Sequence, residues 1–429
     1  MLPDCRKDEH CYPVPKFDLT LQEIEQFREK LEGFHEQFHD CFLRSESREN
    51  FLRYMSGQFS ELERKSIEPI ALNVQNGNVR AMQRFVSEAP WDDDRIMFKY
   101  RSMVNSDLGS PGGALIFDET SFSKKGNDSV GVARQYCGST GKVDNCQVGV
   151  FAAYASEFGY SMIDKRLYIP EQWFTEEYRE RREKCKVPEK MAFKTKPQLA
   201  IEMLNSLAEE ETLPFKYVLA DSIYGNNPEF IDAVSDMPGL TYFVSVPENV
   251  LCWPKTPTTV KKKYKYKGEV RTKTVLADQT KKPVKLSTLA KNINPYFWYR
   301  RTVSEGTKGP ITYEFTRKRI KISNSSLPQK MVWLVIRRTI EDDPRYSYFI
   351  SNASISTRLP TFIWLSGLRW AIEQCFEEAK TDLGMDHYEV RKFPGWNHHM
   401  ITCMLGHFFL WHLKLSLGKK STVHYALAA

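Results

Sequence analysis

Two short, mainly apolar runs that each end in an aspartate constrain this chain more than any other feature of its sequence. The turn signal Ser110-Pro111-Gly112-Gly113 precedes the run from Ala114 to Phe117, which ends at Asp118. The run from Phe215 to Ala220 ends in the same way at Asp221. Short apolar runs bounded by turn residues are typical of buried strands. We therefore expect one sheet in which two strands end at Asp118 and Asp221.

Further strands and helices surround these two runs. Gly131 to Tyr136 and Gln147 to Tyr154 are strand-like, and with the first run they predict a three-stranded antiparallel meander. A helix is expected near Pro197 to Glu210, and another begins at Asn226 or Asn227 with Pro228 at its first turn. Strands and helices that alternate in this way indicate an α/β fold.

The first hundred residues have a different pattern, which is helical. Apolar residues recur at spacings of three and four after Thr20, a potential cap, at Leu21, Ile24, Phe27, Leu31, Phe34 and Phe38. A second helix is expected to begin near Ser45 or Ser47. The pattern predicts an all-α N-terminal domain over residues 1–108, for which a simple helical bundle is the plainest interpretation.

Between about Val246 and Ser356 the sequence becomes rich in Lys, Thr, Val, Tyr and Trp. Alternating segments at Lys261–Val275, Phe297–Val303 and Met331–Arg337 predict a mostly β region. The first segment alternates basic residues with two tyrosines, a pattern that suits a β ribbon on a DNA backbone. A solubilising edge strand is an equally good interpretation, because edge strands often carry lysines.

The strongest helical pattern runs from Thr361 to Leu383, where apolar residues recur at about 100° per residue and Gly384 is placed to end the helix. Arg369, Glu373 and Lys380 are separated by four and seven residues, so they lie along one face. This arrangement suits a metal ligand whose neighbours bind phosphates. The alternative is a solvated helix side with ordinary ion pairs.

These carboxylates suit the cleavage of phosphodiester bonds. Two magnesium ions about 3.5 to 4 Å apart activate the nucleophile and neutralise the leaving oxygen. Because Mg²⁺ takes oxygen ligands, two or three convergent carboxylates are expected. The sequence therefore predicts Asp118, Asp221 and Glu373 as catalytic, metal-binding residues. A lone aspartate beside a turn is more often a cap, so the prediction depends on all three.

Composition excludes several classes of protein. No apolar run reaches the roughly 18 to 20 residues that span a bilayer, and the start MLPDCRKDEHC lacks the apolar core of a signal peptide. The 61 basic residues against 54 acidic residues give a net charge of +7, which suits a polyanionic partner. The nine cysteines form no C-x-x-C pair and are interpreted as reduced thiols. We expect a cytoplasmic or nucleoid-associated protein with no membrane partner.

Two histidine-containing groups are weaker candidates for metal sites. The spacing of the first group fits no common zinc finger, and its members are Cys5, His10, Cys11, His35, His39 and Cys41. His398 and His399 follow Trp396, and we interpret them as surface or core-edge residues because the chemistry already has oxygen ligands.

Several separate blocks of the sequence occur in a characteristic order over most of the chain. They are Ile116-Phe117-Asp118-Glu119-Thr120, Lys124-Lys125-Gly126, Ser129 to Tyr136, Asp144 to Val150, Ala220-Asp221-Ser222-Ile223-Tyr224-Gly225, and Arg369-Trp370-Ala371-Ile372-Glu373 continuing to Asp386-His387-Tyr388-Glu389-Val390-Arg391. Together they resemble bacterial insertion-sequence transposases of the DDE type. One group of that superfamily has a Tyr-Arg-Glu-Lys signature around its catalytic glutamate. Arg369, Glu373 and Lys380 have the same spacing as the Arg, Glu and Lys of that signature. This spacing favours Glu373 over Glu377 or Glu378 as the catalytic glutamate, but Ser366 takes the tyrosine position.

The resemblance implies a fold and a division of the chain. The fold is a ribonuclease-H-like catalytic core interrupted by a mostly β insertion. The implied segments are an N-terminal DNA-binding domain at 1–108, the core at 109–245 and 357–429, and the insertion at 246–356. Residues implied to contact DNA are Arg369, Lys380, Lys124, Lys125, Arg134, Lys261, Lys262, Lys263 and Trp298.

The resemblance also implies an activity and partners. Such an enzyme binds the terminal inverted repeats of its element, excises the element with two Mg²⁺ ions, for which Mn²⁺ substitutes, and joins it to target DNA. A homodimer brings the two ends together. In related enzymes the second strand is cut through a DNA hairpin, with an insertion-domain tryptophan on a flipped base. Trp253, Trp298 and Trp333 are the candidates for that stacking.

Two other classes of function remain open from the sequence. A carboxylate-pair hydrolase, such as a glycosidase, would use Asp118 or Glu119 as acid and nucleophile, but it explains neither the positive charge nor the cations beside Glu373. A transposase-derived DNA-binding protein without catalysis is the second alternative. Metal-dependent cutting of DNA distinguishes the three.

Overall fold

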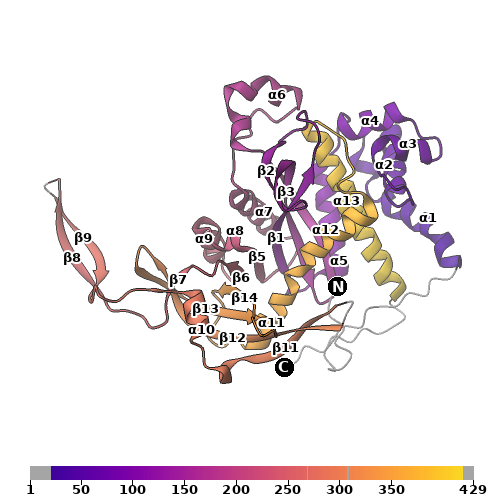
Figure 1. Cartoon of the computed structure of the whole chain (residues 1–429). Helices are drawn as coiled ribbons and strands as arrows, with labels where there is room; N and C mark the ends of the chain where they lie inside the picture. Colours follow the sequence, from indigo (N-terminus) through magenta and orange to yellow (C-terminus); the bar gives the residue numbers. More distant parts are fainter. Residues whose placement is uncertain (1–20, 268, 307–308, 419–429) are drawn as a thin grey trace. The chain divides into compact units, whose positions relative to one another are not determined.

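The computed structural model describes residues 21–267, 269–306 and 309–418 (Figure 1). The chain divides into two compact units, of which the first comprises the described parts of Met1–Lys216 and Arg369–Ala429, and the second comprises Tyr217–Leu368. The second unit is thus a continuous piece of chain inserted between two segments that fold together. Within the described ranges, none of the helices combines the length and the apolar character that a membrane span requires.

The N-terminal part of the first unit is helical, in agreement with its periodicity. Its helices are α1 (Leu21–Glu36), α2 (Ser45–Gln58), α3 (Ile67–Asn73), α4 (Val79–Ser87) and α5 (Asp93–Leu108), with a 3-10 turn at His39–Cys41. The long helix α13 (Phe393–Gly418) packs against α1, α2, α4 and α5, so N-terminal and C-terminal helices share one core (Figure 1). The predicted cap Thr20 lies outside the described residues.

The sheet of the first unit differs from the predicted meander. Its strands are β1 (Ala114–Ser123), β2 (Ala133–Cys137), β3 (Lys142–Ser156) and β4 (Gly159–Tyr168). β1 pairs antiparallel with one edge of β3, and β2 and β4 share the other edge. β3 accommodates both because it is 15 residues long. The sequence did not indicate β4, since the buried Asp164 and Lys165 interrupt its apolar pattern.

β1 also continues five residues past Asp118, so the prediction that Asp118 ends a strand was wrong. Asp118 pairs with Phe151 and Thr120 with Gly149 in the register between β1 and β3. The polar residues after Phe117 remain in the strand because the neighbouring strand satisfies their backbone N–H and C=O groups. Asp118 therefore has a fixed direction within the sheet.

Helices α7 (Lys196–Glu210) and α12 (Trp370–Leu383) pack on this sheet, and α5 and α13 contact its strand β4. α7 contacts β3 and β4, and it begins at Thr195 with a capping box that includes Gln198. α12 contacts β1, β3 and β4. Short helical turns at Glu171–Phe174 and Glu176–Tyr178 and the helix α6 (Arg179–Lys184) connect β4 to α7.

The helix predicted from Thr361 to Leu383 is in fact two helices. α11 (Leu359–Leu368) ends in the second unit, a turn follows at Arg369, and α12 begins in the first unit. Leu365, Ile372 and other members of the apolar stripe are buried on both sides of the turn, so the stripe is continuous although the helix is not. The predicted end at Gly384 is confirmed, since its φ of 67° is a left-handed conformation that favours glycine.

The second unit contains a mixed sheet. Its strands are β5 (Tyr217–Ala220), β6 (Thr241–Val246), β7 (Leu251–Trp253), β10 (Val284–Lys285), β11 (Tyr299–Gly306), β12 (Gly309–Asn324), β13 (Leu327–Arg338) and β14 (Tyr346–Ser351). Their order is β10-β7-β12-β13-β14-β6-β5, and β11 pairs with β12. β5 and β6 are parallel, whereas β6 and β14 are antiparallel. The unit therefore confirms the mostly β character predicted for residues 246–356.

The connections around β5 also follow the prediction. Asp221 comes directly after β5 and precedes the short helix α8 (Ser222–Gly225). Asn227 caps α9 (Pro228–Asp236) through its side chain, with proline in the first turn. α10 (Leu286–Lys291) and a 3-10 turn at Pro295–Phe297 complete the elements of the unit.

The basic segment 261–275 forms a hairpin separate from the large sheet. β8 (Thr259–Tyr266) and β9 (Glu269–Leu276) pair as a two-stranded sheet, labelled in Figure 1. The side chains of β8 are exposed throughout, and those of β9 are exposed up to Thr274. The segment is therefore not an edge strand of the large sheet, and neither of its faces covers a hydrophobic core.

Candidate active site

Asp118 and Thr120 on β1 face α12. Arg369, at the start of α12, places Nη1 3.9 Å from Asp118 Oδ2. Near the other end of the helix, Lys380 Nζ donates a hydrogen bond to Thr120 Oγ1 at 2.8 Å. Side chains two residues apart on a strand share a face, so these two contacts set α12 across the Asp118 face of the sheet.

Glu119 points to the opposite face. Its carboxylate forms an ion pair with Lys196, the first residue of α7, at 2.8 Å. Asp118 and Glu119 are therefore directed to different sides of one strand. They cannot act as a pair on one substrate bond, and of the two only Asp118 faces the helix that carries Glu373.

The Arg369 guanidinium lies between two carboxylates. Its Nη2 is 2.5 Å from Glu373 Oε1, and its Nη1 approaches Asp118 from the same position. The side chains of Asp118, Arg369 and Glu373 are 17%, 24% and 44% exposed, so the group is open to solvent on the Glu373 side. Carboxylates 255 positions apart in the sequence thus converge on one positive charge at an accessible place.

Lys380 supplies a second cation beside the same strand. Burial lowers the pKa of Lys380, because its ammonium lies near the Phe122 ring and is partly removed from water. A partly desolvated ammonium attracts an anion more strongly than an exposed one. Arg369 and Lys380 therefore place two cationic side chains on the Asp118 face, an arrangement suited to a phosphate.

Glu378, an alternative third carboxylate, has a structural role. It accepts hydrogen bonds from Tyr160 at 2.9 Å and Gln374 at 3.0 Å, and it contacts His407 Nε2 at 2.8 Å. Burial acts to raise the pKa of Glu378, but these partners outweigh it, and the pKa lies below its ordinary value. Both of its carboxylate oxygens already have partners within the unit, so Glu378 is a poor candidate for a metal ligand.

Asp221 belongs to the second unit. Its carboxylate accepts the Ile223 N–H at 2.9 Å and caps α8. This is the local role that an aspartate before a helix commonly has. Its participation as a third catalytic carboxylate stays a prediction.

The donor chemistry of the site fits a divalent cation. Oxygen donors from carboxylates are the ligands that Mg²⁺ and Mn²⁺ prefer, and Asp118 and Glu373 already converge on the Arg369 cation. Among the described residues, however, no three His, Cys, Asp or Glu side chains are grouped closely enough to hold a metal ion. Asp118 and Glu373 therefore make an incomplete ligand set that requires a further donor.

The predicted DNA-binding residues of the first unit differ in accessibility. Lys124 Nζ donates to Tyr388 O at 2.9 Å and lies 3.4 Å from the centre of the Tyr388 ring. Burial lowers the pKa of Lys124 to about 7, so this ammonium is held inside the unit. Lys125 and Arg134 are exposed, as a contact with DNA requires.

The three candidate tryptophans are all buried. Trp253, Trp298 and Trp333 are 4%, 9% and 8% exposed. The guanidinium of Arg338 lies 4.1 Å from the centre of the Trp298 ring, and that of Arg317 lies 4.6 Å from the Trp333 ring. A base could stack on Trp298 or Trp333 only after these cations move.

Three exposed aromatic residues adjoin Trp298 in the sequence, two before it and Tyr299 after it, which is 45% exposed. Tyr296 and Phe297, in the 3-10 turn at Pro295–Phe297, are 81% and 54% exposed. Both rings continue the apolar pattern of the strand that follows, so their sequence alone does not mark them as exposed. The signal was Asn294-Pro295, a turn in which the Asn294 side chain accepts the Tyr296 N–H at 2.9 Å.

The histidine groups serve as packing residues. His398 contacts Val86 O at 2.7 Å and His399 contacts the Tyr54 hydroxyl at 2.8 Å. Burial lowers the pKa of His398 to about 4 and that of His399 to about 3, so both rings are neutral near pH 7. Cys5, His10 and Cys11 lie outside the described residues, and the described members of that group form no metal cluster.

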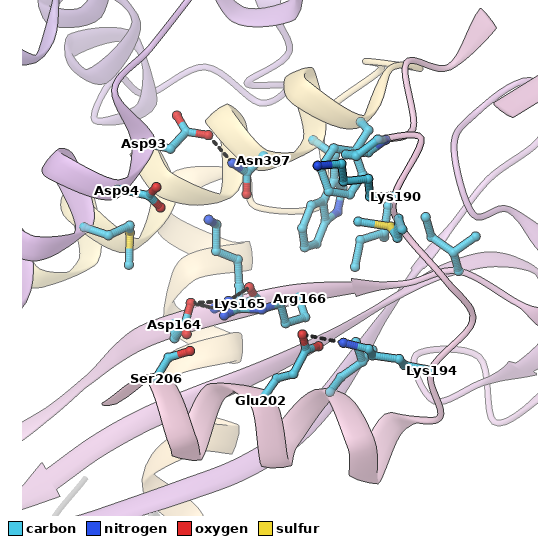
Figure 2. A pocket seen from close by; sticks show the side chains of 18 of the residues that line it. Asp93, Asp94, Asp164, Lys165, Arg166, Lys190, Lys194, Glu202, Ser206 and Asn397 are labelled. Atoms are coloured by element: carbon cyan, nitrogen blue, oxygen red, sulfur yellow. Dashed lines mark hydrogen bonds and ion pairs between the residues drawn. The ribbon is translucent and has the colours of Figure 1, made fainter. Parts of the chain in front are cut away.

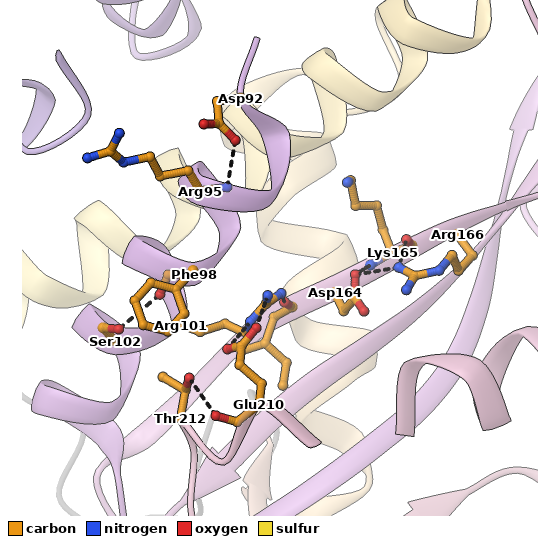
Figure 3. Close-up of polar contacts among 11 residues, drawn as sticks. Asp92, Arg95, Phe98, Arg101, Ser102, Asp164, Lys165, Arg166, Glu210 and Thr212 are labelled. Atoms are coloured by element: carbon orange, nitrogen blue, oxygen red, sulfur yellow. Dashed lines mark hydrogen bonds and ion pairs between the residues drawn. The ribbon is translucent and has the colours of Figure 1, made fainter. Parts of the chain in front are cut away.

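A cavity of about 960 Å³ lies elsewhere in the first unit, lined by parts of α5, β4, α7 and the start of α13 (Figure 2). Burial lowers the pKa of Lys165, on its wall, to about 8. Most of its carboxylates are already paired with cations, as Figures 2 and 3 show: Asp164 with Arg166, Glu202 with Lys194, and Glu210 with Arg101. Each of these three carboxylates has its own cation, whereas Asp118 and Glu373 share Arg369, so this cavity is a weaker candidate than the Asp118 face.

Three comparisons with known proteins show what this chain is similar to. A family model described as DDE superfamily endonuclease matches residues 37–310, more than half of the chain. The probable transposase for insertion sequence element IS701 of Microchaete diplosiphon is 25% identical over 343 residues, which are 79% of this chain and 76% of that protein. A structure of the piggyBac transposase synaptic complex with hairpin DNA aligns with 95% of this chain and 69% of that one, with 11% identity and a TM-score of 0.37. The family match includes Asp118 and Asp221 and stops before α12.

Proposed function

The chain belongs to the DDE superfamily of endonucleases, and from this premise we propose that it is an insertion-sequence transposase with Asp118, Asp221 and Glu373 as its catalytic carboxylates. The observation that carries the proposal is the Arg369 guanidinium between Asp118 and Glu373. A strand and a helix that are distant in the sequence present two carboxylates to one cation at an exposed position. Two carboxylates are part of the donor set that a metal-dependent nuclease requires, and the proposal takes Asp221 as the further donor.

Each residue of the site has a proposed role. Asp118 and Glu373 hold divalent metal, Mg²⁺ or Mn²⁺, and Asp221 completes the ligand set. When bound, two such ions activate the attacking hydroxyl and neutralise charge on the leaving oxygen. Arg369 and Lys380 bind the phosphates beside the cleaved bond and orient them. Their charges also offset the repulsion between the carboxylates and the DNA backbone.

The fold supports a ribonuclease-H-like core. The first unit contributes the antiparallel strands β1, β3 and β4, and the second contributes the parallel pair β5 and β6. We assign the core to residues 109–245 and 357–429 and the β insertion to 246–356. The helices of residues 1–108 are assigned to the binding of the terminal inverted repeats.

The proposed reaction is transposition of a DNA element. The enzyme binds double-stranded DNA at the two element ends as a homodimer, cuts the element out and joins it to target DNA. Cutting of the second strand through a hairpin belongs to this proposal. The exposed Tyr296 and Phe297, rather than the buried Trp298, are aromatic rings available to an unpaired base.

One alternative class is now disfavoured. A glycosidase needs two carboxyl groups that flank one bond, about 5 to 10 Å apart. Asp118 and Glu119 face opposite sides of β1, and Glu119 is paired with Lys196. The alternative that remains is a transposase-derived DNA-binding protein without catalysis.

The experiment that tests the proposal is cleavage of labelled DNA carrying the terminal repeat of the element, with Mg²⁺, Mn²⁺ or EDTA. Wild type should cut in either metal and not in EDTA, and Glu373→Gln should not cut. Glu377→Gln is the matched control, because Glu377 is exposed on the same helix one turn later. An active Glu373→Gln variant would remove Glu373 from the ligand set, and specific binding without cutting in any metal would favour the inactive DNA-binding protein.

A further inference from the structure

The β8–β9 hairpin has two faces of different chemistry. Side chains alternate along each strand, and the register places Lys261 opposite Thr274, Lys263 opposite Thr272, and Lys265 opposite Val270. We call this side the lysine face. The tyrosine face is the other side, and its polar and aromatic members are Lys262, Tyr264, Tyr266, Glu269, Arg271 and Lys273.

On the tyrosine face, the single acid and two of the three cations contact partners within the hairpin. Lys273 Nζ lies 5.4 Å from the centre of the Tyr264 ring, and the Arg271 guanidinium lies 5.0 Å from that of Tyr266. Glu269, the one acidic residue in the sequence of the hairpin, forms an ion pair with Arg271 at 3.0 Å. These cross-strand contacts stabilise the ribbon itself, since an isolated hairpin is marginally stable in water.

The lysine face has no such compensation. Lys261, Lys263 and Lys265 form a row whose cross-strand neighbours are threonine and valine, and the acid of the hairpin lies on the other side. Residues two apart on a strand are about 6.6 Å from each other, so the row extends over roughly 13 Å. Three like charges in a row repel one another, and a linear polyanion would remove that repulsion.

From these faces we propose that the lysine face of the hairpin is a binding surface for the sugar–phosphate backbone of duplex DNA, independent of sequence. The inference rests on the proposed function for the identity of the polyanion. The ribbon is two strands, or about 5 Å, wide and needs no core beneath it, so it lies along a groove wall without displacing base pairs. The tyrosine face keeps the ribbon folded and is turned away from the phosphates.

The expected signature is a change in salt dependence, because each phosphate that a lysine neutralises adds about 0.9 to the slope of log K against log salt. The probe is a labelled 30-base-pair duplex of unrelated sequence, and its affinity for the full chain is measured by fluorescence anisotropy in EDTA between 50 and 200 mM KCl. Lys261→Ala/Lys263→Ala/Lys265→Ala should lower the slope by about 2.7. Over that range wild type should therefore lose about 40-fold more affinity than the triple variant.

Two controls separate the effect of the lysine face from the effect of the overall positive charge of the protein. Lys281→Ala/Lys282→Ala/Lys285→Ala removes three exposed lysines nearby in the sequence and should leave the slope within about 0.5 of wild type. Lys263→Ala should lower the slope by about 0.9, whereas Lys262→Ala, its neighbour on the tyrosine face, should not.

A triple variant with the wild-type slope would overturn the inference, and so would equal losses in Lys262→Ala and Lys263→Ala. The binding assay contains no metal, so its failure is distinct from failure of the proposed function. If the wild type cuts DNA and the triple variant keeps its slope, only the ribbon inference is wrong. If the slope falls as expected but no metal supports cutting, the ribbon inference holds and the nuclease is wrong.

Discussion

The Asp118 face and the β8–β9 hairpin are both rich in charge, but they hold it in opposite ways. Asp118, Arg369 and Glu373 are partly buried, pair with one another and are carried by a strand and a helix with apolar residues beneath them. Lys261, Lys263 and Lys265 are exposed on a ribbon that covers no core. The first arrangement fixes the direction of its charged side chains. The second provides positive charge on side chains whose positions are little constrained.

This difference matches what each task requires. Metal-assisted cleavage needs donor atoms held to within about 0.5 Å, which only packed elements provide. Binding to a phosphate backbone is a longer-range attraction that tolerates movement of the side chains. Substitutions should therefore affect chemistry in the first region and salt-dependent affinity in the second.

The largest expected effect is on cleavage. Arg369→Ala removes the charge that neighbours both carboxylates and should lower the cleavage rate by about 10² to 10³-fold, the range for loss of one positioned charge-stabilising group. The Lys261/Lys263/Lys265 triple variant should cut at nearly the wild-type rate in 50 mM salt with saturating DNA. Single-turnover cleavage at saturating DNA measures both. Equal loss in the two variants would contradict the separation of chemistry from binding.

The next effect is on the acid stability of the first unit. Burial lowers the pKa of His35 and His398 to about 4 and that of His399 to about 3, from an ordinary value of 6.5. The unfolded chain then binds more protons than the folded chain below pH 6.5, so stability is full above that pH and is lost as the pH falls. Each histidine contributes about 1.4 kcal/mol per pH unit, or up to about 4 kcal/mol in total at pH 5.5.

Thermal unfolding monitored by near-UV circular dichroism at pH 7.5, 6.5 and 5.5 measures this loss. The hairpin contains no histidine, so it adds no such dependence. His399→Gln should flatten the pH dependence by about one third. A constant melting temperature down to pH 5.5 would show that these rings titrate normally.

A smaller effect should separate two glutamates of α12. Glu378→Gln removes a charge bound by Tyr160 and His407 and should lower the free energy of unfolding by about 1 to 2 kcal/mol. Glu373→Gln should change it by less than about 0.5 kcal/mol while abolishing cleavage. Urea unfolding of both variants gives the comparison. If Glu373→Gln were the more destabilising change, Glu373 would be a structural residue.

The smallest effect should come from the tyrosine face. Tyr264→Ser/Tyr266→Ser removes two rings that are 38% and 48% exposed and cover no core, so the main melting transition should shift by less than the equivalent of about 0.5 kcal/mol. Differential scanning calorimetry of the full chain measures the shift. A fall of several degrees would mean that the hairpin packs on the body of its unit, and the contrast between the two regions would disappear.

Local patterns predicted many elements correctly. Asn227 before Pro228 and Gly384 after Leu383 are local signals, because a helix end depends on neighbouring residues. The resemblance to DDE transposases, and with it the preference for Glu373, also came from blocks of sequence. The predictions that were wrong depended on distant residues. β1 continues past Asp118 because β3 pairs with it, and the apolar periodicity from Thr361 to Leu383 gave no indication of the turn at Arg369.

The sequence by itself determined the residue types of the candidate site, the helical and β regions, and the family to which the chain belongs. Only the tertiary structure decided that Asp118 rather than Glu119 faces α12, that Glu378 is held by Tyr160 and His407, and that Lys124 is half-buried while Lys261 is exposed. The physical reason is that propensities and caps act between neighbours along the chain. Burial and direction depend instead on which distant strand or helix packs against a residue.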